Sequence, residues 1–334
     1  MNNETLNTLK EGKINQLSYN QFCQLINCTG DDQKDLFTIA NEKKENGYGN
    51  KVFVRGVIEI SNACLNKCNY CSMNVENTEL KRYTLTLEEI QKSVDEGIKN
   101  GIRVFHLSSG ENCEFSDGLL LDMVEYIYEK GCKIILVIGK RKYSLLKKLY
   151  EKGVSVFISK FETSNPWLYS EYNNKNGSHD LRVEYLRKLR EIGYKIGTGN
   201  IVGLPFQRDS TLYEDLKLLC KLHSEQASTS RFISNPYSKY SKYESGSITK
   251  TKNFIALMRI FMDENTIIPT NSSIGLEDKF DVLLAGANLL SINLTPKDKC
   301  KNYIIYNDET RIQQNLDYYI QRVREMQLDI EYEF

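Results

Sequence analysis

Eight short apolar or β-branched segments recur along the chain and alternate with amphipathic segments of helical period. Several of the helical segments end in glycine, which is typical of a helix C-terminus. Such an alternation favours a parallel sheet with right-handed crossovers, and eight units close most simply into a barrel. We therefore predict an α/β fold, a (βα)8 TIM-type barrel, with strands at residues 52–60, 102–109, 132–139, 154–162, 194–203, 227–234, 266–273 and 288–295.

The barrel does not use the whole chain. Residues 3–47 carry only helical patterns, so an N-terminal helical extension is expected over residues 1–50. The barrel is expected over residues 51–310, followed by a C-terminal helix or tail over 311–334. No linker or low-complexity segment divides these parts. The active site of such a barrel is expected at the C-terminal ends of its strands.

Charge and composition exclude several kinds of partner. Basic and acidic residues balance at 44 each, so no overall charge favours binding to nucleic acid or to an acidic membrane surface. The N-terminal residues have no apolar stretch typical of a signal peptide, and we expect a cytoplasmic protein. Nine irregularly spaced cysteines in a chain of 334 residues do not suggest a disulfide framework.

Three cysteines lie close together directly after the first predicted strand. The stretch "CLNKCNYC" places Cys64, Cys68 and Cys71 in the first βα loop. Three thiolates there can bind three irons of a 4Fe–4S cluster and leave the fourth iron without a protein ligand. Two alternatives remain at this point, a structural zinc site completed by a distant residue and three unrelated buried thiols.

The CxxxCxxC motif with an aromatic residue before its last cysteine resembles the cluster motif of the radical S-adenosylmethionine (SAM) enzymes. The resemblance is closest to the biotin synthase group, and within it to the radical SAM maturase of FeFe-hydrogenase and to methylornithine synthase. It implies one 4Fe–4S cluster and SAM as cofactors, with cleavage of SAM to methionine and a 5′-deoxyadenosyl radical. The matching stretches are "VFVRGVIEISNACLNKCNYC", "LKRYTLTLEEI", "LSSGEN", "FETSNPWLY", "GYKIGTGNIVGLP" and "AGANLLSINLTP".

The same resemblance implies a set of SAM-binding residues. The "SSGE" stretch is similar to the motif that receives the methionyl amine, and "GNIVG" is similar to the motif on the adenine side. Glu162 and Arg182 resemble a pair that holds the ribose and carboxylate of SAM, and an arginine fork suits a carboxylate. A solvated surface arginine is the alternative for Arg182. The expected cofactor-binding residues are Tyr70, Ser109, Gly110, Glu111, Glu162, Arg182, Gly199 and Ile201.

The chain departs from both relatives where a substrate would lie. Biotin synthase builds an auxiliary cluster with cysteines whose positions here hold His106, about Ile135, and Gly197. Where the maturase has a glutamine before its SGE, and Arg-His before Glu-Thr, this chain has Ser108, Lys160 and Phe161, and "RFISNPYSKYSKYESG" also differs. We therefore expect a single cluster, and packing or incidental roles for Cys23, Cys28, Cys113, Cys132, Cys220 and Cys300.

Polar residues are expected inside the barrel. By period two, Arg55 and Glu59 share the face of the first strand that we predict to point inward. A purely structural barrel would favour aliphatic residues there, so we expect a small polar substrate, plausibly derived from an amino acid. The predicted catalytic residues are Arg55, His106 and Arg231, with an Arg55–Glu59 ion pair in the core as the alternative.

The predicted function is therefore that of a radical SAM enzyme which modifies or rearranges a small polar substrate. An electron donor such as flavodoxin or ferredoxin is the expected protein partner. The resemblance leaves two alternatives open, a hydrogenase maturase acting on an organometallic iron precursor and a catalytically silent iron–sulfur or SAM-binding accessory protein.

Overall fold

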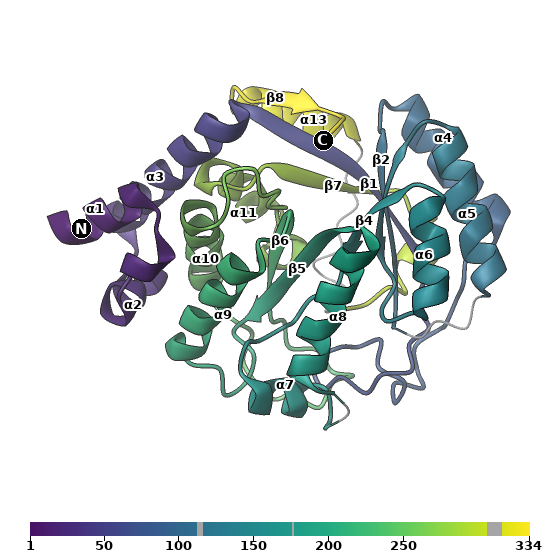
Figure 1. The fold of residues 1–334 in the computed structure, drawn as a ribbon, viewed down its shortest axis with the longest axis horizontal. Helices are drawn as coiled ribbons and strands as arrows, with labels where there is room; N and C mark the ends of the chain where they lie inside the picture. Colours follow the sequence, from purple (N-terminus) through teal and green to yellow (C-terminus); the bar gives the residue numbers. More distant parts are fainter. Residues whose placement is uncertain (112–115, 176, 306–315) are drawn as a thin grey trace.

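The computed structural model describes residues 1–111, 116–175, 177–305 and 316–334. The chain begins with three helices, α1 (Asn3–Glu11), α2 (Tyr19–Asn27) and α3 (Gly30–Tyr48), with the 3₁₀ turn η1 (Ile14–Gln16) between the first two. Figure 1 shows them at one edge of the molecule, beside α9 (Asp209–Leu222) and α10 (Ile248–Phe261). Side-chain oxygens of Asn2 and Ser18 cap α1 and α2, which explains where these helices begin.

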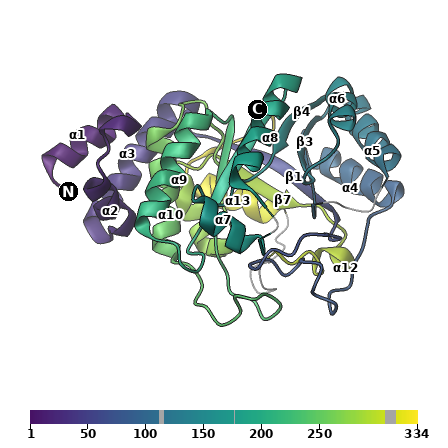
Figure 2. The same cartoon turned by 60° about the horizontal axis from the view of Figure 1, so that its bottom comes forward.

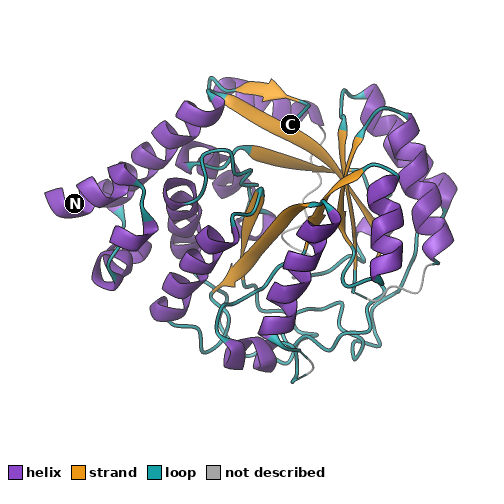
Figure 3. Cartoon of the chain, in the orientation of Figure 1, coloured by secondary structure: helices purple, strands orange, loops and turns teal. Residues whose placement is uncertain are grey.

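Seven parallel strands follow one another around a curled sheet in the order β6-β5-β4-β3-β2-β1-β7. They overlap seven of the predicted segments, although β1 and β6 extend beyond the predicted bounds, and Figure 3 shows the strands in the interior with helices around them. The strands are β1 (Lys51–Ser61), β2 (Val104–Ser109), β3 (Lys133–Val137), β4 (Val154–Ile158), β5 (Lys195–Val202), β6 (Gln226–Arg231) and β7 (Leu289–Asn293).

The eighth predicted strand, at residues 266–273, closes the ring without forming a regular strand. Ile267 makes a single parallel bridge to Gln226 of β6, and Pro269 makes one to Leu289 of β7. Proline has no N–H to donate to a ladder, which limits this segment to isolated bridges. The predicted TIM-type barrel is thus confirmed, except that the segment at residues 266–273 forms two isolated bridges in place of a regular strand.

Helices cover the outside of the sheet (Figures 1 and 2). The first of these helices is α4 (Leu87–Lys99). Thr86 and Glu89 form a reciprocal capping box at its start, as the sequence "TLEE" favours. The remaining helices are α5 (Asp117–Glu129), α6 (Tyr143–Glu151), α7 (Pro166–Tyr172), α8 (His179–Ile192), α11 (Leu276–Asp281), α12 (Lys297–Cys300) and α13 (Leu316–Glu325), with 3₁₀ turns η2 (Ser272–Ile274) and η3 (Val282–Ala285). In the described ranges, no helix is both long and apolar enough to cross a membrane.

The C-terminal residues cover the end of the barrel at which the strands begin. A short strand, β8 (Asp329–Glu331), pairs in parallel with residues 51–53 at the start of β1, which the sequence did not predict. The ring of Phe334 then packs on Phe53 with centroids 5.2 Å apart, and against an apolar cluster that includes Val104 and Ile135 of β2 and β3. The N-terminal ends of the strands therefore meet an apolar floor, and the polar residues lie toward their C-terminal ends.

Candidate functional site

The three predicted cluster cysteines lie together in the loop that follows β1. Cys64, Cys68 and Cys71 all line one cavity of about 240 Å³ near the C-terminal ends of the strands. Backbone hydrogen bonds hold the loop, including one from the N–H of Cys71 to the carbonyl of Cys68 at 3.3 Å. The N–H of Leu65 donates to the carbonyl of Glu111 at 3.2 Å, which ties the loop to the end of β2.

Arg82 fastens this loop, and the sequence reading did not assign it a role. Its guanidinium donates to four backbone carbonyls, those of Asn62 and Met73 at 2.8 Å, Asn74 at 2.6 Å and Asn77 at 3.2 Å. One planar fork with five N–H groups can satisfy several carbonyls at once, which lysine cannot do in the same geometry. The fold of the cysteine loop therefore depends on a charged side chain that lies 11 residues after Cys71, the last of the three cysteines.

The environment of the three thiols fits a multi-iron cluster. Burial raises the pKa of Cys71 to about 12, and burial together with the neighbouring thiols Cys71 and Cys64 raises the pKa of Cys68 well above its usual value. Iron would relieve this crowding, because metal binding replaces the thiol protons with a cation. Over the described ranges, no three His, Cys, Asp or Glu side chains converge on a single-ion position. A cubane cluster does not need such convergence, since each thiolate binds a different iron.

The end of β2 passes directly under the cysteine loop. A Cβ atom added to Gly110 would lie 2.3 Å from the carbonyl oxygen of Ala63 and 2.6 Å from Cβ of Cys64. Only glycine lets the two backbones approach this closely. Ser109 and Glu111 line the cavity on either side of this glycine, as the resemblance implies for residues that receive the amine of SAM.

Arg182 lies in the same cavity, paired with Glu111. Its Nη2 donates to Glu111 Oε2 at 2.9 Å, while Nη1 donates to Ser159 Oγ at 2.9 Å and Nε to the hydroxyl of Tyr169 at 3.0 Å. Burial acts to lower the pKa of Arg182, but the Glu111 carboxylate and Tyr169 outweigh it and raise the pKa. The side chain is 12% exposed, so the alternative of a solvated surface arginine is wrong.

Glu162 occupies the other side of this cavity and is not the partner of Arg182 in this structure. Its carboxylate lies 3.4 Å from the ammonium of Lys160. Its backbone φ is +63°, an uncommon conformation for a residue other than glycine that is found at functional sites. Lys160 also donates to Ser230 Oγ at 3.2 Å, whereas Phe161 points into the hydrophobic core.

The adenine-side motif is held against β6. A Cβ atom on Gly199 would lie 1.8 Å from the carbonyl oxygen of Ser228, so close packing of β5 on β6 requires glycine there. Ile201 lines the cavity, and Tyr70 faces it from the cysteine loop while packing in one apolar cluster with Ile201. Of the eight predicted cofactor-binding residues, Gly199 is the one outside the cavity lining; the others are Tyr70, Ser109, Gly110, Glu111, Glu162, Arg182 and Ile201.

A second cavity of about 290 Å³ adjoins the first inside the barrel. The two share the lining residues Val137, Ser230, Tyr303 and Ile305. Most of the residues that line the second cavity carry polar side chains, as predicted. Its polar and charged lining comprises Arg55, Glu59, His106, Ser108, Ser228, Thr229, Ser230, Thr270, Asn271, Ser272, Lys279, Ser291, Asn293, Cys300, Tyr303 and Tyr319.

Two of the three predicted catalytic residues line this second cavity. Arg55 is 6% exposed and its Nε donates to Ser291 Oγ at 3.0 Å, while its Nη1 has no hydrogen-bond partner. No ion pair joins Arg55 to Glu59 among the described side chains, so the alternative of a core ion pair is not what the structure shows. Burial, and then the charge of Arg55, hold the pKa of His106 well below its usual range, so the imidazole is neutral.

The prediction for Arg231 needs correction. It is the last residue of β6 and lines neither cavity. Ser228 and Ser230, earlier in the same strand, do line the second cavity. Ser228, Thr229 and Ser230 all line the second cavity, so its wall along β6 ends one residue before Arg231. The methylene Cγ of Arg231 instead lies beside Gly246.

The other cysteines do not form a second cluster site in the part of the chain that the structure describes. Cys300 lines the second cavity and its sulfur accepts from Asn293 Nδ2 at 3.3 Å. Cys132 is buried outside the cavities, and Cys23, Cys28 and Cys220 are partly buried elsewhere. Cys113 lies outside the described residues.

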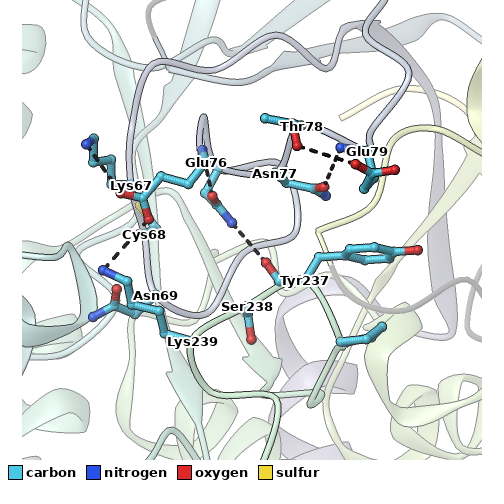
Figure 4. A pocket seen from close by; sticks show the side chains of 12 residues that line it. Lys67, Cys68, Asn69, Glu76, Asn77, Thr78, Glu79, Tyr237, Ser238 and Lys239 are labelled. Carbon is cyan, nitrogen blue, oxygen red and sulfur yellow. Dashed lines mark hydrogen bonds and ion pairs between the residues drawn. The ribbon is translucent and has the colours of Figure 1, made fainter.

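A polar pocket of about 330 Å³ lies on the outer side of the cysteine loop (Figure 4). Cys68 lines both this pocket and the inner cavity. Lys67 and Lys239 pair with Glu76 at 3.3 and 3.8 Å across the pocket. Asn74 Nδ2 donates to the carbonyl of Tyr237 at 3.3 Å and joins the two loops that form it.

Comparisons with known proteins agree with this geometry. Residues 58–219 match the family model of the radical SAM superfamily. The [FeFe] hydrogenase maturase subunit HydE of Thermotoga maritima is 30% identical over 274 residues, which cover 81% of this chain and 78% of that protein. The 3-methylornithine synthase of Methanosarcina barkeri is 24% identical over 275 residues, covering 81% and 78%.

The fold also matches a solved structure over nearly its whole length. Methylornithine synthase (PylB) superimposes with a TM-score of 0.87 and 21% identity, covering 98% of this chain and 97% of that one. The structural similarity extends from the N-terminal helices through the barrel, and the family match spans the cysteine loop. The chain belongs to the radical SAM superfamily and is an enzyme of that superfamily.

Proposed function

We propose that this enzyme holds one 4Fe–4S cluster through Cys64, Cys68 and Cys71, binds SAM in the adjoining cavity, and acts on a small polar substrate inside the barrel. In this superfamily, bound cluster and SAM supply a 5′-deoxyadenosyl radical. The observation that carries the proposal is the pair of adjoining cavities, one lined by the three cysteines and the other by polar strand residues. The shared lining residues leave a path between cofactor and substrate.

The SAM-binding residues have distinct tasks in this proposal. The carbonyl and hydroxyl groups of Ser109 and the Glu111 carboxylate are acceptors for the methionyl ammonium, beside the open iron. Arg182 is the donor for a carboxylate or ribose oxygen, because three of its nitrogens are already oriented by fixed partners. Tyr70 and Ile201 offer apolar surface for the adenine. The close approach at Gly110 keeps these groups at the cysteine loop.

The substrate is proposed to be derived from an amino acid. Selective attack by a reactive radical requires a substrate held in one orientation, and orientation is supplied by fixed polar contacts. Arg55 is a buried guanidinium with a free Nη1, which suits a carboxylate. The cavity of about 290 Å³ is at the lower end of ligand-site volumes, which restricts the substrate to a small molecule.

A maturase function is the second candidate, favoured by the 30% identity to the hydrogenase maturase subunit. Under it, the same cavity would accept an organometallic iron precursor. A catalytically silent accessory protein is disfavoured because the residues for cluster and SAM line one continuous cavity. The two enzyme candidates are separated by measuring 5′-deoxyadenosine formation with amino acids and, separately, with iron carbonyl–cyanide precursors. Formation that depends on an amino acid supports the first candidate, and formation that depends on an iron precursor supports the second.

Electrons are proposed to enter through the outer pocket beside Cys68, from a small redox protein such as a flavodoxin or ferredoxin. The support is the position of Cys68, which lines both the inner cavity and the outer pocket (Figure 4). A substitution on the rim, such as Lys239→Glu, is expected to slow reduction by the protein donor. Reduction by dithionite is expected to stay unchanged, because a small molecule needs no docking surface.

The test of the proposed function is anaerobic reconstitution with iron and sulfide, followed by SAM and dithionite. We expect about four irons per chain and formation of 5′-deoxyadenosine and methionine. Loading close to eight irons would contradict the single cluster. An intact cluster spectrum without any 5′-deoxyadenosine would favour the accessory-protein alternative.

Arg182→Met and Glu162→Ala are expected to weaken SAM binding while leaving the cluster spectrum intact, because neither side chain is a cluster ligand. The loss for Arg182→Met is expected to be the larger, about 30-fold or more, since the variant also leaves the partly buried Glu111 carboxylate without its ion-pair partner. Equilibrium binding of SAM to the reconstituted, unreduced protein measures both. Unchanged affinity in both variants would remove these residues from the site.

A further inference from the structure

A second buried cation lies beside Arg55 at the inner end of the substrate cavity. Lys279, from helix α11, is 4% exposed, and its Nζ donates to the carbonyl oxygen of Ser291 at 3.4 Å. Arg55 donates from Nε to the hydroxyl of the same Ser291 at 3.0 Å. Two positively charged groups from different elements thus converge on one residue of β7.

No carboxylate in the described part of the chain forms an ion pair with either of these two cations. Among the side chains that the structure describes, neither Arg55 nor Lys279 forms an ion pair. Lys279 is partly compensated by Tyr319, whose ring centroid lies 4.6 Å away and whose hydroxyl accepts at 3.3 Å. Like charges held together out of water are costly unless an anion joins them. Burial, and then the positive charge of Arg55, lower the pKa of Lys279 to about 8, because both disfavour the charged ammonium.

The acidic residues of the same helix do not serve Lys279. Asp278 and Asp281 pair with Lys252 at 2.8 and 2.9 Å, and Glu277 pairs with Arg322 at 2.9 Å. Those pairs are partly exposed, so α11 directs its carboxylates outward and its lysine inward. This arrangement is unexpected for a structural lysine, which would pair with an acid on its own helix.

The two cations occupy the part of the cavity away from SAM. Arg55, Lys279, Ser291 and Tyr319 line the second cavity but not the one that contains the cysteines. Arg55 precedes the end of β1 at Ser61 by six residues, or about 20 Å of extended chain. A ligand anchored by these cations therefore extends from the barrel interior toward the cysteine loop.

We propose that Arg55 and Lys279 together bind one carboxylate of the substrate, and that this contact directs the opposite end of the substrate toward SAM. The inference rests on the proposed function only in taking this cavity as the substrate site. The guanidinium supplies two parallel donors and the ammonium a third, so one carboxylate can satisfy both charges. Lys279 is thus a specificity-determining residue, for molecules with a free carboxylate.

The test uses reconstituted, unreduced enzyme, with propionate as probe and its neutral isostere propionamide as comparison. We expect propionate, and not propionamide, to raise the midpoint of thermal unfolding. In Lys279→Met, the affinity for propionate obtained from these shifts is expected to fall about 30-fold, with partial recovery in Lys279→Arg. Lys297→Met, which removes an exposed lysine of α12, is the matched control and is expected to bind as the unmodified enzyme does.

The unliganded variant gives a second readout that a structural lysine would not share. Lys279→Met should raise the midpoint of thermal unfolding in the absence of any anion, because it removes a buried positive charge that forms no ion pair with a described carboxylate. A lower midpoint would assign Lys279 a structural role through Tyr319 and overturn the proposal. Equal stabilisation by propionate and propionamide, or by propionate in enzyme and variant, would overturn it as well. Stabilisation by sulfate and not by propionate would replace the carboxylate with an inorganic oxyanion.

The affinity for propionate should also depend on pH through Lys279. It is expected to be constant near neutral pH, where propionate is ionised, and to fall as pH rises through about 8, where unliganded Lys279 loses its proton. The variant Lys279→Met should show no such fall. The groups that face Lys279 or line its cavity are Arg55, Tyr319, Glu59 and the neutral His106, and its own helix carries Glu277, Asp278 and Asp281.

These measurements involve no SAM cleavage, so the two hypotheses fail separately. Enzyme that binds propionate through Lys279 but makes no 5′-deoxyadenosine contradicts the proposed function and leaves the carboxylate site in place. If the enzyme cleaves SAM but Lys279→Met binds propionate as tightly as the unmodified enzyme does, the result contradicts the carboxylate site alone.

Discussion

Replacing Cys64, Cys68 or Cys71 with alanine is expected to remove most of the iron and abolish SAM cleavage. Each thiolate is the sole protein ligand of one iron, and the loop offers no spare thiol to replace it. A cubane with two protein ligands has two exposed irons and is lost during reconstitution. Iron content and the absorbance of the cluster measure the first effect, and 5′-deoxyadenosine formed with dithionite measures the second.

Cys23→Ala is the matched control for these variants. Cys23 lies on α2 in the N-terminal helices and lines neither cavity, so its variant should load about four irons and cleave SAM normally. Full iron loading in any one of the three loop variants would show that another residue ligates the cluster. Cys300 would then be the first candidate among the described cysteines, since it alone lines the adjoining cavity.

Gly110→Ala is expected to impair SAM binding and destabilise the cluster without removing a ligand. The added Cβ would meet the carbonyl of Ala63 at 2.3 Å and Cβ of Cys64 at 2.6 Å. Both contacts are to backbone or to the first side-chain atom, so the cysteine loop has to move as a whole. Overpacking at a rigid contact costs about 1–3 kcal/mol, and here the displaced atoms include a ligand residue. SAM affinity and the rate of iron loss to a chelator report the effect.

Gly118→Ala tests whether any glycine-to-alanine change has the same result. Gly118 lies in the first turn of α5, and the nearest atom to an added Cβ is Ser116 Oγ at 3.8 Å. Alanine is about 1 kcal/mol better than glycine within a helix, so this variant should be as stable as the parent or more so. If Gly110→Ala retained normal SAM affinity and iron retention, the close packing of β2 under the loop would not be needed for cofactor binding.

Some of the site follows from short-range sequence patterns. The three cysteines are within eight residues of each other, so their spacing alone places them in one loop. Ser109, Gly110 and Glu111 follow a strand, and parallel strands bring their C-terminal ends together, which predicts the meeting with the cysteine loop. The period-two reading of β1 put Arg55 and Glu59 inside, and both line the second cavity.

Other parts required the tertiary structure. The sequence did not indicate that Arg182 pairs with Glu111, because this contact depends on α8 bringing Arg182 to residues that follow β2 and β4. Arg231 was misplaced because the cavity wall along β6 ends at Ser230, and the sequence does not show where along a strand the lining stops. Residues 266–273 have the composition of a strand, but Pro269 limits them to single bridges.

The sequence by itself determined the order of strands and helices and the loop that holds the cysteines, because these depend on contacts between near neighbours and on a repeating apolar pattern. It did not reveal Lys279, which lies in a short helix with three acidic residues and resembles a solvated lysine. Nor did it reveal that Arg82 fastens the cysteine loop through four carbonyls. The tertiary structure decided both, because the burial of a charge and the partners it meets depend on elements distant in the chain. For Lys279 those elements are β1, β7 and α13, which come together only when the barrel closes.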